Sequence, residues 1–282
     1  MENYCPRCGQ RFGSGLSLSE FFRDVADDQF GIDAKVPRTL RALFLKPGLL
    51  TTEYIAGRVA RYIPPFRLYL LTSVLFFVLL SFLSRRSDWA ERAEADIRRE
   101  MAGDTARAAS DSARAVGITI NGGKAWLDSV NVNIPWQWLD QKIEANLRAL
   151  AKLPPSQALR RITEAVIEEI PKVMFVLLPL FALLLKLFYF RRVRFYIEHF
   201  VFALHFHAFV YIVFCLALII GSDWILLIPS IALPLYLLLA MKRVYQQGWF
   251  VTTVKWLVLG NTYLVVLLLG LTFALVWALT AA

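Results

Sequence analysis

Cysteine and histidine are scarce in this chain, with three of each among 282 residues. Three histidines are too few for a histidine-rich membrane di-iron oxygenase. The sequence also lacks a glycine loop for nucleotide phosphates, the strained turn that presents a hydrolase serine, and an acid pair in a recognisable context. Without any of these catalytic signatures, we predict that the chain is not an enzyme.

Acidic residues are outnumbered, with 22 against 31 basic residues. Residues 84–170 contain 13 basic and 13 acidic residues. The rest of the chain contains 18 basic and 9 acidic residues, so the whole basic surplus lies outside that segment. This surplus stands mostly in short stretches beside apolar runs, where basic residues set the orientation of a membrane protein. We therefore expect no nucleic-acid partner.

Hydrophobic residues make up 57% of the chain, above the 45–50% or so of ordinary soluble domains. Five apolar runs are long enough to cross a hydrocarbon core of about 30 Å. The predicted fold is an all-α integral membrane protein with five transmembrane helices, at residues 66–83, 171–190, 195–220, 224–241 and 256–279.

The basic residues that flank these runs predict one orientation. They cluster at 58–67, 191–194 and 242–243, and all three places fall on the same side of the membrane. The start MENYCPRC has no basic run leading into an apolar core, so no cleavable signal peptide is predicted. We expect a cytoplasmic N-terminus, a periplasmic C-terminus, and a small, mostly helical periplasmic domain over residues 84–170.

Residues 1–13 contain a Cys-Pro-x-Cys-Gly turn, which presents the thiolates of Cys5 and Cys8 as in zinc ribbons and knuckles. A structural zinc site needs four ligands, but Cys215 lies in an apolar run and the histidines are far downstream. The sequence therefore predicts a zinc-ribbon-like half site. Two copies of the chain share one zinc ion, or a partner protein completes the site, or the knuckle is vestigial and holds no metal.

Residues 14–65 are predicted to form cytoplasmic and interfacial amphipathic helices. Within them, a helix over residues 51–62 would place four side chains on one face, at i, i+4, i+7 and i+8: Tyr54, Arg58, Arg61 and Tyr62. Lys46-Pro47-Gly48 breaks the chain before this helix and Pro64-Pro65 after it. With Arg67, this face is typical of residues that bind anionic lipid headgroups or a protein partner.

The densest polar cluster in any predicted span lies in the run 195–220 and consists of Glu198, His199, His205 and His207. Ionisable groups within a span are functional candidates, because burying them unpaired in lipid is costly. One hypothesis is an inward-facing site for a proton, an ion or a lipid phosphate. The other is that Arg194 pairs with Glu198 while the histidines hydrogen-bond to neighbouring helices. The spacing excludes a metal site on this helix alone.

Several short motifs, taken together, resemble those of one group of bacterial membrane proteins. They are Tyr4-Cys5-Pro6-Arg7-Cys8-Gly9-Gln10, Arg38-Thr39-Leu40, Lys46-Pro47-Gly48, the run from Gly57-Arg58 to Phe66-Arg67, and the run from Glu198 to His207. The combination is similar to domain-of-unknown-function family 3667. The resemblance implies a multi-pass protein of the bacterial inner membrane with a cytoplasmic zinc-ribbon-like head, and it implies no particular activity.

Two functional hypotheses follow from these features. The first is a non-enzymatic scaffold or envelope protein that binds anionic lipid or a partner, with a homodimer or another membrane protein as the expected partner. The second is a small transporter, or an ion or proton pathway, that uses the polar cluster of the third span. A lipid-modifying enzyme ranks third because no nucleophile stands in a suitable context.

The half site makes a prediction about metal content. If two chains share one zinc ion, the purified protein should contain about half a zinc ion per chain, since each copy supplies two of four ligands. Metal analysis of the purified full-length protein measures this ratio. A value well below one zinc ion per two chains would exclude the shared site.

Overall fold

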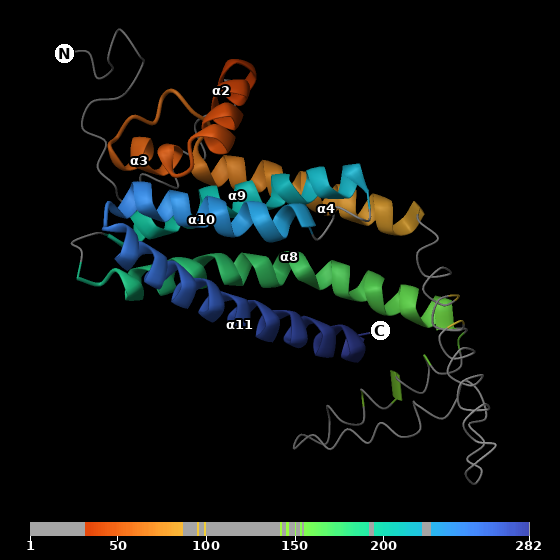
Figure 1. Ribbon diagram of the computed structural model, residues 1–282. Coiled ribbons are helices and arrows are strands. Elements are labelled where there is room, and N and C mark those ends of the chain that lie inside the picture. The colour runs from red at the N-terminus through yellow and green to blue at the C-terminus, as the bar shows by residue number, and fades with distance from the viewer. Residues whose placement is uncertain are drawn as a thin grey trace. The chain divides into compact units, whose positions relative to one another are not determined.

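The computed structural model describes residues 32–86, 155–191, 195–221 and 227–281, together with residues 95, 99, 142, 145, 146, 150 and 153. The described residues are helical and contain no strand, which confirms the all-α fold (Figure 1). The helices are α2 (Ile32–Leu45), α3 (Leu49–Ile55), α4 (Pro65–Arg86), α8 (Pro155–Phe188), α9 (Tyr196–Ile220), α10 (Leu227–Tyr245) and α11 (Trp249–Ala281).

Within these residues, five helices are long and apolar enough to cross a membrane, as predicted: α4, α8, α9, α10 and α11. The second span differs from its expected form. This span was predicted to begin at Pro171, after the domain over residues 84–170, but α8 begins at Pro155 and runs through Pro171 without a break. Proline is tolerated inside membrane helices, because neighbouring groups can satisfy the backbone that it leaves unbonded.

The chain divides into two compact units. One consists of Met1–Leu80 with Met174–Leu268, and the other of Ser81–Val173 with Leu269–Ala282. The described parts of the second unit are mainly the C-terminal ends of α4 and α11 and the N-terminal half of α8. In α11, Phe273 stacks on Trp277 at 6.3 Å between ring centroids. All the contacts that concern the candidate site lie in the first unit.

Helix α9 is the centre of the first unit. Between Ile197 and Phe209, every residue except Phe200 is buried. A helix that is apolar on all sides is expected to be surrounded by other helices. Around α9, α10 and the short helices α2 and α3 make close contacts.

Helices α2 and α3 lie along the N-terminal half of α9 (Figure 1). They bury Leu43 and Leu50, and the Phe44 ring meets Phe209 at 5.4 Å between centroids. Helix α4 begins farther along α9, because Tyr69 in its second turn lies 5.7 Å from Tyr211, about 22 Å beyond the start of α9. The two short helices thus cover the part of α9 that α4 leaves uncovered.

The predicted helix over residues 51–62 is wrong in its extent, because α3 ends at Ile55. Gly57 adopts a left-handed φ of 75° just beyond the end. Its N–H donates to the Tyr54 carbonyl at 2.9 Å, and the Arg58 N–H donates to the Glu53 carbonyl at 2.9 Å. This is a Schellman termination, for which glycine is favoured. The shared helical face of Tyr54, Arg58, Arg61 and Tyr62 therefore does not form.

Gly48 allows the turn between α2 and α3 to approach α10 closely. Its φ is 76°, and an added Cβ would lie 2.9 Å from the Ala240 carbonyl oxygen. Beside it, the Pro47 carbonyl accepts a hydrogen bond of 2.8 Å from Arg243 Nη1. The sequence predicted this turn as a helix break, and the structure adds that it is a docking point on α10.

The close approach predicts that Gly48→Ala lowers the free energy of unfolding by about 2 kcal/mol or more. A left-handed alanine costs roughly 1–2 kcal/mol, and overlap with the α10 backbone adds to that cost. Gly248→Ala is the matched control, because its φ is not in the left-handed region and an added Cβ meets nothing within 4 Å. Unfolding in detergent micelles compares the two variants. Equal stability would contradict the docking role of Gly48.

Candidate functional site

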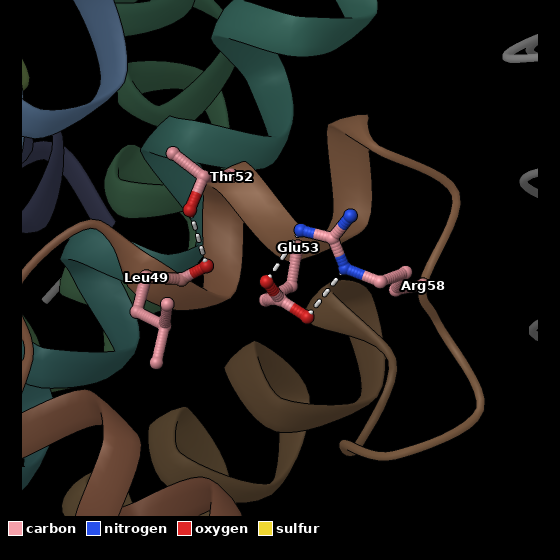
Figure 2. Close-up of polar contacts among 4 residues, drawn as sticks. All are labelled: Leu49, Thr52, Glu53 and Arg58. Carbon is pink, nitrogen blue, oxygen red and sulfur yellow. Dashed lines mark hydrogen bonds and ion pairs between the residues drawn. The ribbon is translucent and has the colours of Figure 1, made fainter.

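An ion pair joins Glu53 of α3 to Arg58 of the loop that follows it (Figure 2). Arg58 Nε donates to Glu53 Oε2 at 2.8 Å, and its Nη2 donates to Oε1 at 2.6 Å. The hydrogen bond from Arg58 lowers the pKa of the Glu53 carboxyl, and the same bond raises the pKa of Arg58. Glu53 therefore compensates much of the Arg58 charge at neutral pH.

The other residues predicted to bind lipid have different surroundings. Tyr54 and Tyr62 are half-buried and pack against the hydrophobic core, so their rings are mainly structural. Arg67 is half-buried in the first turn of α4. Arg61 is exposed. Of the five predicted residues, Arg61 best combines exposure with a charge that no ion pair of the described residues compensates.

Sequence reasoning missed three further exposed basic side chains, which lie on α2 and in the turn after it: Arg38, Arg41 and Lys46. Arg38 and Arg41 are three residues apart and share a helix face. Phe44 and Leu45 stand next to them and are also exposed, Leu45 by 68%. The alternation of basic and exposed apolar side chains is typical of helices at a membrane interface. The i, i+3 arginine pair was the signal that could have revealed it.

Thr39 connects α2 to the loop that carries Arg61. Its side chain is fully buried, and Oγ1 accepts a hydrogen bond of 3.1 Å from the Ile63 N–H while donating to the Lys35 carbonyl at 2.8 Å. The loop is thereby held against the helix that carries Arg38 and Arg41. We call the four exposed cations of this region the basic surface: Arg38, Arg41, Lys46 and Arg61. Glu53 is the one acidic residue between positions 35 and 67, against seven basic residues.

Glu198 caps its own helix. Its carboxylate Oε1 accepts a 3.4 Å hydrogen bond from the Phe195 N–H, and the Glu198 N–H donates to the Phe195 carbonyl at 3.1 Å. An acidic side chain in the first turn of a helix also complements the helix dipole. The predicted partner, Arg194, lies outside the described residues, so the Arg194–Glu198 pair stays a prediction.

Each of the three histidines joins α9 to a different helix, as one of the two hypotheses predicted. His199 Nδ1 lies 2.8 Å from Tyr245 Oη on α10, and His205 Nδ1 lies 3.1 Å from Thr51 Oγ1 on α3. His207 Nε2 lies 2.8 Å from Tyr263 Oη on α11. All three rings are buried. The histidines therefore act in separate interhelical contacts.

The His207 contacts define its tautomer. Nδ1 lies 2.8 Å from the Ala203 carbonyl, which can only accept, so Nδ1 carries the proton. In the neutral ring, Nε2 then accepts from the Tyr263 hydroxyl. The Tyr263 ring also packs on Phe181 of α8 at 4.6 Å between centroids. This contact ties α8, α9 and α11 together.

A cluster of stacked aromatic rings lies beside the first turn of α9. Tyr189 and Tyr245 are almost parallel, with centroids 3.6 Å apart, and His199 lies beside them. Lys255 Nζ lies 4.0 Å from the Tyr189 ring centroid, at cation–π distance. The Tyr189 ring thus stabilises the ammonium group of Lys255 at this end of the bundle.

The predicted zinc ligands Cys5 and Cys8 lie outside the described residues. Cys215, the cysteine that the structure does describe, is buried and reduced in α9. Within the described ranges, no group of three or more histidine, cysteine or acidic side chains could hold a metal ion. The zinc half site therefore stays a prediction from the sequence.

The comparison with known families adds one match. No curated protein and no solved structure matches the chain. Residues 33–77 match the family described as "Protein of unknown function (DUF3667)". The match begins in α2 and ends in α4, so it includes all four residues of the basic surface and the Gly48 turn. Over this segment the chain is similar to the DUF3667 family, in agreement with the resemblance inferred from its motifs.

Proposed function

We propose that this protein binds anionic phospholipid headgroups through the basic surface on α2 and the loop before α4. The observation that carries the proposal is the combination of Arg38, Arg41 and Arg61, all exposed, with the exposed apolar side chain of Leu45. The leucine side chain suits the acyl region, and the guanidinium groups suit phosphate oxygens.

The position of the segment supports this proposal. Helices α2 and α3 pack along the N-terminal half of α9, and α4 starts beside the middle of α9. By the distribution of basic residues, this is the cytoplasmic end of the bundle. The anionic lipids of a cytoplasmic leaflet attract basic residues close to it, by about 1 kcal/mol for each one.

The same features support a role as a scaffold of the bacterial inner membrane. A segment that is fixed to the bundle on one side can present charge on the other side without rearrangement. Such a protein would organise lipids, or proteins bound to them, in envelope maintenance. The zinc-ribbon-like head, with zinc shared between copies or absent, would lie on the same cytoplasmic side.

A transporter is the competing proposal, and the contacts around α9 lend it less support. A proton or ion pathway needs polar groups that converge, whereas His199, His205 and His207 contact three different helices. Glu198 is engaged at the helix start. We therefore keep lipid binding as the leading proposal.

The proposal predicts that Arg38→Gln combined with Arg41→Gln weakens binding of anionic lipid. At about 1 kcal/mol for each basic residue, the double variant should lower the affinity for phosphatidylglycerol roughly 30-fold. Native mass spectrometry of the full-length protein, released from nanodiscs with mixed phosphatidylglycerol and phosphatidylcholine, measures the lipids that remain bound. Phosphatidylcholine retention should not change.

Two further variants separate this from a general charge effect. Arg160→Gln with Arg161→Gln removes the same charge from α8 and should leave lipid retention unchanged. Glu53→Gln removes the carboxylate that compensates Arg58, so it should increase retention of phosphatidylglycerol. Lipid binding by the basic surface is wrong if the α2 and α8 variants retain phosphatidylglycerol equally, or if neither the α2 variant nor Glu53→Gln changes its retention. A protein would then be the better candidate for binding to the basic surface.

A further inference from the structure

Helix α11 carries a continuous exposed stripe with the spacing of a coiled coil. The positions alternate in steps of three and four residues, and all eight side chains are exposed: Val251, Val254, Val258, Asn261, Val265, Leu268, Thr272 and Leu275. Their apolar members are between 40% and 56% exposed. A repeat of 3.5 residues keeps one seam facing a parallel helix over its whole length. We call this stripe the α11 seam.

The α11 seam points away from the rest of the first unit. Tyr263, which contacts Phe181 and His207, stands at the heptad position opposite the seam. Thr252 and Leu259, on the other side of the helix from the seam, are fully buried. The inward face of α11 is therefore already occupied, and the seam forms part of the exposed remainder of the helix, beside exposed side chains off the seam such as Leu257, Leu264 and Leu269.

Asn261 distinguishes the seam from an ordinary lipid-facing surface. It is exposed within an apolar run, about 9 Å along the helix beyond Lys255. In the described part of the chain its amide makes one hydrogen bond, from Nδ2 to the Leu257 carbonyl at 2.8 Å. The carbonyl oxygen of the amide would face hydrocarbon at a cost unless another helix covers it.

We propose that α11 joins two copies of this chain into a parallel dimer through the α11 seam. An asparagine amide both donates and accepts, so two Asn261 side chains can pair across a two-fold axis. The first position of each heptad holds a β-branched residue: Val251, Val258, Val265 and Thr272. The fourth holds leucine in the outer half, at Leu268 and Leu275. β-Branched residues at the first position with leucine at the fourth favour two parallel strands.

Membrane topology agrees with a second copy as the occupant. Two copies inserted in the same orientation have parallel α11 helices, as this heptad pattern requires. Their N-terminal segments then lie on the same side of the membrane. If the predicted zinc half site forms, Cys5 and Cys8 would supply two of its four ligands and a second copy would supply the other two. The inference does not depend on lipid binding by the basic surface.

Cysteine cross-linking of the full-length protein in membranes tests the seam. In a background with Cys5→Ser, Cys8→Ser and Cys215→Ala, single cysteines replace Val258 or Val265 on the seam. Phe273→Cys is the control, because Phe273 is 66% exposed on the same helix but lies off the seam. The seam cysteines should give about fivefold or more disulfide-linked dimer than the control on oxidation, since only they can approach at bonding distance.

Asn261 provides a second readout in purified, reconstituted protein. Asn261→Leu should weaken self-association roughly three- to tenfold, measured by single-molecule photobleaching over a range of protein-to-lipid ratios, and Asn261→Gln should retain it better. Equal cross-linking at positions 258, 265 and 273, or monomers at every protein-to-lipid ratio tested, would contradict the proposed dimer. The α11 seam would then face lipid. Cross-links from the seam to a different protein alone would contradict the dimer as well.

Discussion

Polar groups inside an apolar environment need partners, and in this protein that constraint is concentrated on α9. Water is absent from the hydrocarbon core, so each buried imidazole that lacks a partner carries a large cost. The three α9 histidines meet it by bonding to Thr51, Tyr245 and Tyr263, on three different helices. Apolar packing alone discriminates weakly between helices in lipid, whereas these bonds specify which helix lies where.

This constraint explains why residues 33–77, the segment that matches DUF3667 and is called the DUF3667 segment below, have two different faces. On one side, Thr51 bonds to His205, Thr39 receives the Ile63 N–H, and Gly48 lies against the backbone of α10. These contacts fix residues 33–77 to the bundle. The other side holds the basic surface and the exposed Leu45. A segment anchored in this way can present charge to a leaflet while its backbone stays in place, which is the physical basis of the proposed function.

The sequence predicted much of the fold because the membrane simplifies the problem. The length of the apolar runs and the small number of charges within them were sufficient to find all five spanning helices. The extent of α3 was wrong because helical periodicity in Tyr54 to Tyr62 was given more weight than Gly57, whose left-handed conformation ends the helix. The second span was predicted to begin at Pro171, but α8 begins earlier and continues through this proline.

The candidate site was harder to predict than the fold. Exposure cannot be read from one sequence, so Tyr54 and Tyr62 were included although they pack on the core, and Arg38 and Arg41 were overlooked. The Glu53–Arg58 ion pair depends on the geometry of the Schellman termination, which sequence spacing alone does not reveal. Of the two hypotheses for the histidines, hydrogen bonds to neighbouring helices agree with the structure, but the individual partners depend on how α9 packs.

A double-mutant cycle on Thr51 and His205 tests most directly whether a polar contact with α9 holds the DUF3667 segment in place. Thr51→Val, His205→Leu and the combined variant would be compared by reversible unfolding of the full-length protein in lipid–detergent micelles. For the hydrogen bond between Thr51 and His205, we expect a coupling free energy of about 1 kcal/mol, in the range measured for hydrogen bonds between membrane helices. Effects that add to within about 0.3 kcal/mol would show that the two residues do not interact, and would contradict this expectation.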